Sequence, residues 1–238
     1  MPDRHIVPFG GLRPWAKGVH PIVEYLLNLA GPAETSRVKV AVIPTATGDS
    51  PATIVGIYNR FPPERVERSH LALFDRTLDD IEGYLLAQDL IWVGGGNTAS
   101  MLAVWRAHGV DKALRAAWEA GKILTGGSAG SLCWFESGTT DSFNLKRLAP
   151  LHDGLGFLAG SHCPHYDGEE QRRPLYQRLI GEGFSPGYAI DDDAALHFKG
   201  QEIVDVITAR KDATAYRVEL RDGHAVETPL RARLLSVE

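Results

Sequence analysis

The sequence predicts an α/β fold built on a doubly wound, mostly parallel sheet with a C-terminal β extension. Three observations support this prediction. Short apolar runs alternate with segments of helical spacing through the first two-thirds of the chain. One of these runs ends in a glycine-rich turn with Ser128 at its apex. After about Phe157, short extended runs replace the alternation.

The alternating elements follow one another at regular intervals. Expected strands cover 38–44, 69–74, 89–93 and the run into Ser128, and the expected helices cover 53–60, 78–87, 98–108 and 111–120. After Asp89, residues 90–93 are all apolar, as in a strand buried on both faces of a parallel sheet. Gly109 and Gly121 mark the ends of the last two helices. Ligands of such a sheet bind at the carboxyl ends of its strands.

The C-terminal third is predicted to be mainly extended. Its expected strands are 160–165, 188–191, 202–209 and 215–220, with one amphipathic helix at 171–180. The last two strands predict a β hairpin that turns at Lys211 and Asp212. The sequence contains no internal repeat and no linker rich in proline and serine. We therefore expect a single domain over residues 1–238.

Composition restricts the classes of function. A net charge of −5 without a basic run argues against nucleic acid or an anionic membrane as the main partner. No apolar stretch approaches the ~18 residues of a membrane span, and the first residues lack a signal-peptide pattern. The two cysteines, Cys133 and Cys163, form neither a disulfide framework nor a metal-ligand spacing. We expect a cytoplasmic protein without metal or cofactor.

The segment from Gly126 to Gly130 reads G-x-S-x-G between a strand and a helix. In that context the motif forms a sharp turn that exposes a nucleophilic serine. Glycines suit the turn because the backbone comes too close to its neighbours for side chains. The alternative is that Ser128 only caps the following helix, since serine is a preferred N-cap residue.

A nucleophilic serine requires a histidine base and an acid that orients it. His165 is favoured over His162 because Pro164 restricts the backbone before it, and both histidines enter a loop after an apolar segment. Asp191, Asp192 and Asp193 interrupt an otherwise strand-like segment, where acids are unfavourable without a purpose. A solvated turn is the alternative explanation of this triplet, and Asp141 is a competing acid.

An oxyanion hole needs two N–H groups directed at developing negative charge. Ala129 follows the serine, and the turn from Gly94 to Asn97 ends the neighbouring strand, so both turns offer free amides. Gly94-x-Gly96-x-x-Ala99 also matches a dinucleotide-binding fingerprint. That interpretation is disfavoured because the motif follows the third strand and no acid ends the next one.

Four blocks together resemble the peptidase E family of serine peptidases, which includes aspartyl dipeptidases and belongs to a wider group with cyanophycinases. The blocks are 93–98, 127–130, 164–167 and 189–193, and the resemblance covers roughly residues 38–200. It implies a flavodoxin-like fold similar to class I glutamine amidotransferases, with serine in place of their cysteine.

The resemblance also implies roles for individual residues. Ser128 matches the nucleophile, His165 the base, and Gly96 and Ala129 the oxyanion-hole donors. Asp192 aligns best with the acid, while Asp191 and Asp141 stay open. Aspartyl dipeptidases of the family use an arginine after the histidine loop to bind the substrate's N-terminal aspartate. Arg172, Arg173 and Asn97 are the candidate substrate-binding residues here, although the local pattern around the two arginines is shifted and richer in acids.

The leading hypothesis is a serine exopeptidase that hydrolyses short peptides, di- or tripeptides, through an acyl-enzyme. One alternative is an α/β-hydrolase esterase, in which the acid is followed by a later histidine such as His197 or His224. Another is a non-catalytic small-molecule binding module with an amidotransferase-like fold. The preferred N-terminal residue and the formation of a homodimer stay open.

Overall fold

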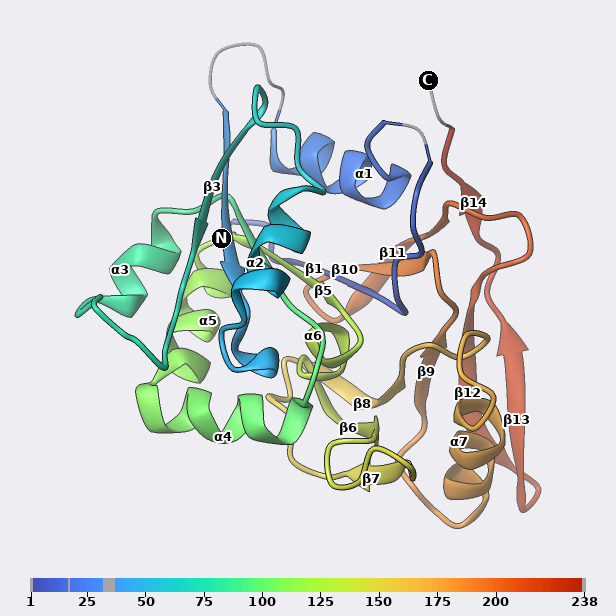
Figure 1. Cartoon of the computed structure of the whole chain (residues 1–238). Helices are drawn as coiled ribbons and strands as arrows, with labels where there is room; N and C mark the ends of the chain where they lie inside the picture. Colours follow the sequence, from blue (N-terminus) through green and yellow to red (C-terminus); the bar gives the residue numbers. More distant parts are fainter. Residues whose placement is uncertain (1, 17, 32–36, 237–238) are drawn as a thin grey trace.

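The computed structural model describes residues 2–16, 18–31 and 37–236. These residues form two β-sheets with helices around them (Figure 1). Within the described chain, the first sheet has eight strands in the order β14 (Arg233–Leu234), β11 (Glu202–Thr208), β10 (Ala194–Lys199), β1 (His5–Phe9), β5 (Ile123–Gly127), β4 (Leu90–Val93), β2 (Val38–Ile43) and β3 (Val66–His70). Its section from β1 to β3 is entirely parallel, as predicted.

Helices cover both faces of this parallel section. They are α1 (Pro21–Ala30), α2 (Pro51–Tyr58), α3 (Ile81–Leu86), α4 (Thr98–His108) and α5 (Val110–Glu119), with a 3₁₀ turn, η1, at Thr45–Thr47. Alternate residues of β4 enter opposite cores: Leu90 and Trp92 pack with α1 and α2, whereas Ile91 and Val93 pack with α3, α4 and α5. The sheet is therefore doubly wound, which confirms the predicted fold class.

The second sheet is the larger difference from the predicted architecture. Among the described residues it has six strands in the order β13 (His224–Pro229), β12 (Ala215–Arg221), β9 (Gly187–Ile190), β8 (Leu158–Cys163), β6 (Phe135–Thr140) and β7 (Ala149–Leu151). Helix α7 (Arg172–Gly181) packs against β12 and β13, and the one-turn helix α6 (Ala129–Leu132) follows β5. One apolar cluster contains residues of both sheets, including Leu124 of the first and Leu158 of the second.

The predicted hairpin of 202–209 and 215–220 is wrong. β11 pairs with β10 in the first sheet, whereas β12 pairs with β9 and β13 in the second. The chain crosses between the sheets at the segment where a simple turn was expected. Thr214 N–H donates to Asp191 Oδ2 at 3.0 Å, which ties the start of β12 to the end of β9.

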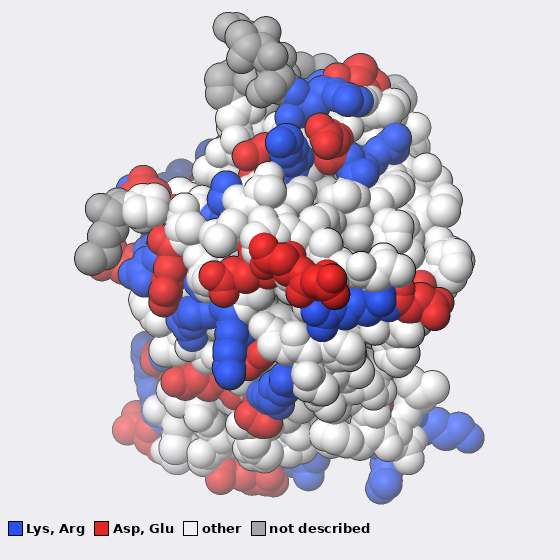
Figure 2. Space-filling model, turned by 90° about the vertical axis from the view of Figure 1, so that its left-hand side faces the viewer, with Lys and Arg blue, Asp and Glu red and all other residues white. Residues whose placement is uncertain are grey.

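Acidic and basic side chains lie interspersed on the face that Figure 2 shows, in agreement with the modest net charge. None of the described helices combines the length and apolar character that crossing a membrane requires.

Candidate active site

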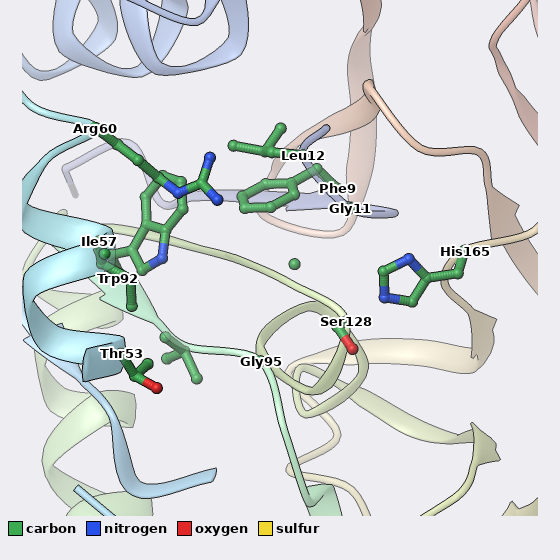
Figure 3. A pocket seen from close by; sticks show the side chains of 13 residues that line it. Phe9, Gly11, Leu12, Thr53, Ile57, Arg60, Trp92, Gly95, Ser128 and His165 are labelled. Atoms are coloured by element: carbon green, nitrogen blue, oxygen red, sulfur yellow. The ribbon is translucent and has the colours of Figure 1, made fainter. Parts of the chain in front are cut away.

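A cavity of about 310 Å³ lies at the carboxyl ends of three neighbouring parallel strands. Residues at or after the ends of β1, β4 and β5 line one side of it, together with His165 from the loop after β8 (Figure 3). Helix α2 and Arg60 line the other side. The cavity therefore occupies the position that an open parallel sheet offers to ligands.

Ser128 stands at the sharp turn between β5 and α6. Its φ of 57° and ψ of −122° are unfavourable for a residue with a side chain, and such strain costs on the order of 1–3 kcal/mol. The turn packs closely against β4: a Cβ atom on Gly126 would lie 2.5 Å from the Val93 carbonyl oxygen, so only glycine fits at this position. The Ser128 side chain makes no capping hydrogen bond to the helix behind it. This geometry fits a nucleophile turn and removes the capping alternative.

Two backbone amides beside Ser128 are available to a ligand. Within the described residues, neither the Gly96 N–H nor the Ala129 N–H donates to another group of the chain. Gly96 has a φ of 137°, in a region that favours glycine. Ala129 opens α6, and the first amides of a helix have no intrahelical acceptor. The pair can therefore donate to an oxyanion.

His165 follows β8 in the left-handed backbone region, with a φ of 53°. Its Nδ1 lies 2.7 Å from Asp192 Oδ1. Because a carboxylate only accepts, Nδ1 is assigned as the donor, and Nε2 is left free to accept a proton. Figure 3 shows the His165 ring directed toward the Ser128 turn. In the described part of the chain no hydrogen bond joins Ser128 Oγ to His165, and such bonds often tighten only when substrate is present.

Each of the three consecutive acids has its own hydrogen-bond donors, and the Arg13 guanidinium lies within 3.9 Å of both Asp192 and Asp193. Asp192 accepts from His165, whereas Asp191 accepts from Thr214 N–H and, at 3.3 Å, from Tyr216 OH. Asp193 accepts from Arg13 N–H at 2.9 Å. They lie in the short connection between β9 and β10, where the chain reverses and turns each side chain in a different direction.

Asp191 and Asp141 are placed apart from His165. Asp191 is buried, and this burial raises the pKa of its carboxyl to about 6. Asp141 lines a separate surface hollow together with Leu145 and Arg147. Of the three acids considered in the sequence, Asp192 is the one that contacts the histidine.

The glycine pair after β1, Gly10 and Gly11, was missed by sequence reasoning. A Cβ atom on Gly11 would lie 2.6 Å from His165 Cε1 and would also overlap Asp192 Oδ1. The Gly10 carbonyl accepts the Ser128 N–H at 3.1 Å, and the Gly11 carbonyl accepts the Asp193 N–H at 2.8 Å. This turn therefore contacts all three candidate catalytic segments. The only signal in the sequence is the Gly-Gly pair after a short apolar run.

The three candidate substrate-binding residues are not brought into the cavity. Arg172 is buried, and its guanidinium donates to Glu169 at 2.7 Å and to the Thr139 carbonyl at 3.0 Å. Arg173 pairs with Glu227 and stacks over Tyr166. Asn97 caps α4 by accepting the Ser100 N–H at 2.8 Å, and its amide donates to Ser142 O. All three side chains have structural partners.

The other histidines considered in the sequence lie elsewhere. His162 is buried below the turn, with Nε2 2.9 Å from Ser131 Oγ, and burial lowers its pKa to about 3. His197 contacts Tyr25 OH and His5, and burial lowers its pKa to about 4. His224 begins β13 and is exposed. Over the described residues, no cluster of three histidine, cysteine or acidic side chains has the arrangement of a metal site.

Comparison with known proteins supplies the context for this arrangement. Residues 16–206 match the model of peptidase family S51. The chain is 41% identical to the uncharacterized peptidase YgaJ of Bacillus subtilis over 215 residues, which cover 89% of this chain and 90% of that protein. It is 32% identical to peptidase E of Actinobacillus pleuropneumoniae over 123 residues, 48% of this chain and 52% of the relative.

The fold also matches a solved structure. The crystal structure of a peptidase from an acI-B1 Actinobacterium superposes with a TM-score of 0.69 at 18% identity, covering 97% of this chain and 95% of that one. At this identity the likeness concerns the fold.

Replacing Asp191 with asparagine is expected to change how stability depends on pH. The pKa of Asp191 rises from 3.8 to about 6 on folding, so the folded chain holds this proton more tightly than the unfolded chain. The resulting stabilisation is complete below about pH 4 and is lost as the pH rises through about 6. The free energy of unfolding of the wild type should therefore fall relative to Asp191→Asn across this window. Urea denaturation of both proteins measures the difference, and a difference independent of pH would contradict the assignment.

Proposed function

This chain belongs to peptidase family S51 and is a serine-type peptidase, and we propose that it is an exopeptidase that hydrolyses short peptides through Ser128, His165 and Asp192. The observation behind this proposal is a histidine fixed by a carboxylate at 2.7 Å in the same cavity as a strained serine turn. The cavity of about 310 Å³ favours a short peptide, because it lies at the lower end of ligand pockets, roughly 300–1,000 Å³.

In the proposed mechanism, His165 Nε2 takes the proton of Ser128 Oγ as this oxygen attacks the peptide carbonyl carbon. The Asp192 carboxylate holds Nδ1–H and stabilises the imidazolium that forms. The oxyanion of the tetrahedral intermediate accepts from the Gly96 and Ala129 N–H groups. His165 then donates its proton to the leaving amine, and water hydrolyses the acyl-enzyme with the same base.

Neither alternative function is retained. The esterase arrangement needs a histidine later than the acid, but His197 and His224 do not line the cavity with Ser128. The binding-module hypothesis does not account for the strained serine, the fixed histidine and the two available amides together. The cytoplasm stays the predicted location, and a homodimer stays open.

Ser128→Ala is expected to abolish peptide hydrolysis, because the other hydroxyl among the described lining residues, that of Thr53, lies on the α2 side, away from His165 (Figure 3). The loss in kcat should be on the order of 10⁴–10⁶, as for other serine nucleophiles. A fluorophosphonate should add one adduct to the wild type in intact-mass spectra and none to the variant. Release of amino acids from a panel of di- and tripeptides measures activity. Labelling that persists in Ser128→Ala, or a wild type that cleaves no peptide of the panel, would contradict the proposal.

Asp192→Asn is expected to lower kcat on the order of 10³–10⁴, because the neutral amide does not stabilise the imidazolium and its NH₂ group can favour the wrong histidine tautomer. Asp191→Asn is the matched control at the adjacent position, and Asp141→Asn is a second one. Both controls should stay within about tenfold of the wild type, since neither carboxylate contacts His165. Equal losses in Asp191→Asn and Asp192→Asn would refute the assignment of the acid.

Gly11→Ala tests the geometry without removing any reacting group. The Gly11 backbone lies outside the left-handed region, so its φ and ψ angles can accommodate alanine. The added methyl group would overlap His165 and Asp192 and should displace both side chains. We expect kcat/KM to fall by roughly a hundredfold or more, as for misplaced catalytic groups. Gly181→Ala in α7 is the control, because its Cβ would meet nothing within 4 Å. Unchanged activity in Gly11→Ala would show that His165 and Asp192 need not be held as described.

A further inference from the structure

One face of helix α2 and the turn after it borders the cavity opposite Ser128. Thr53, Gly56, Ile57 and Arg60 line the cavity, at the spacing of i, i+3, i+4 and i+7 that places residues on one helix face. Figure 3 shows Arg60 on this side with its guanidinium directed toward Phe9 and Leu12, whereas Ser128 and His165 lie on the opposite side.

The surroundings of Arg60 are those of an anion-binding side chain. Its guanidinium forms no salt bridge and no side-chain hydrogen bond with any described residue. Partial burial beside Trp92 and Phe9 lowers its pKa from the ordinary value. A desolvated charge is costly unless it is paired, so an arginine in this position favours a ligand that supplies the opposite charge.

The cavity wall contains no acid to pair with Arg60. Of the thirteen described residues that line it, none is aspartate or glutamate, and His165 is the one other titratable side chain. The field inside the cavity is therefore positive on the α2 side. A substrate ammonium group is disfavoured there, whereas a substrate carboxylate is attracted.

On these grounds we propose that Arg60 binds a carboxylate of the peptide substrate and so determines specificity from the α2 side of the cavity. This inference rests on the proposed peptidase function. The planar guanidinium offers paired N–H donors that match the two oxygens of a carboxylate. A short peptide carries this group either as an acidic side chain on its N-terminal residue or as its C-terminal carboxylate. The apolar walls from Phe9, Ile57 and Trp92 strengthen the pairing by excluding water.

The first experiment uses peptide pairs that differ in one carboxylate. Asp-Leu and Asn-Leu differ in the side chain, and Ala-Leu and its C-terminal amide differ at the other end. With the wild type, one of the two exchanges should lower kcat/KM by roughly ten- to a hundredfold, as expected for a lost charge-assisted hydrogen bond. The pair that responds identifies the source of the carboxylate.

The same pairs are then measured with Arg60→Met, which keeps the length of the side chain and removes its charge. The discrimination between carboxylate and amide should fall to less than about twofold. Arg178→Met is the matched control, because Arg178 is an exposed arginine of α7 that does not line the cavity, and it should discriminate as the wild type does.

Gly56→Leu provides a second variant that keeps Arg60. A Cβ atom on Gly56 meets nothing within 4 Å, and leucine favours a helix over glycine, so the variant should fold. Gly56 lines the cavity on the same helix face as Arg60, so the leucine side chain should occupy space on the α2 side and raise KM for the preferred carboxylate peptide more than tenfold. An unchanged KM would contradict the assignment of this cavity to the carboxylate.

A binding measurement separates this inference from the proposed catalysis. Calorimetric titration of Ser128→Ala with the same peptides should show affinity for the preferred carboxylate that is lost in Ser128→Ala/Arg60→Met. Binding without hydrolysis by the wild type would refute the peptidase proposal and keep the carboxylate site. If the wild type hydrolyses peptides with no preference in either pair, or if the preference survives in Arg60→Met, the proposed role of Arg60 is refuted and the peptidase proposal is unaffected.

Discussion

The arrangement of the site depends on the tight turn at Gly10 and Gly11, after the central strand β1. This turn accepts hydrogen bonds from Ser128 N–H and Asp193 N–H, while Gly10 N–H donates to the Ala194 carbonyl. It thus joins the end of β5 to the acidic connection between β9 and β10. The missing Cβ of Gly11 leaves the space in which the His165 ring meets the Asp192 carboxylate. Side chains from three distant segments converge because one backbone turn contacts all of them.

Charge around this turn is distributed so that neighbouring acids do not compete. Asp193 pairs with His20 at 3.2 Å, and Asp167 accepts the backbone N–H of Asp192 at 2.8 Å. Arg13 and Arg210 both pair with Asp167 and lie near Asp193. On the α2 side, by contrast, Arg60 has no acidic partner among the lining residues. Near His165 the charged side chains are thus paired within the protein. On the α2 side, the proposed partner of Arg60 is a carboxylate of the substrate.

Much of this could be predicted from the sequence. The parallel strands β2, β4 and β5 are apolar runs, and G-x-S-x-G between a strand and a helix correctly indicates the strained turn. The position of β1 could not be predicted, because it is short and contains Pro8, which lacks the N–H of an ordinary central strand. The split into two sheets was also missed, since strands of either sheet have the same residue pattern. No pattern in the sequence distinguishes Arg60 from the other arginines, because its position in a cavity lined by no acid depends on the fold.

The central claim is that Ser128, His165 and Asp192 act together over the Gly96 and Ala129 amides. A crystal structure of the chain carrying a phosphonyl group on Ser128 Oγ tests this claim most directly. The account predicts a phosphonyl oxygen at about 3 Å from both amide nitrogens. It also predicts His165 Nε2 beside the Ser128 oxygen and Nδ1 still bound to Asp192. A phosphonyl oxygen directed away from both amides, with His165 turned out of the cavity, would contradict it.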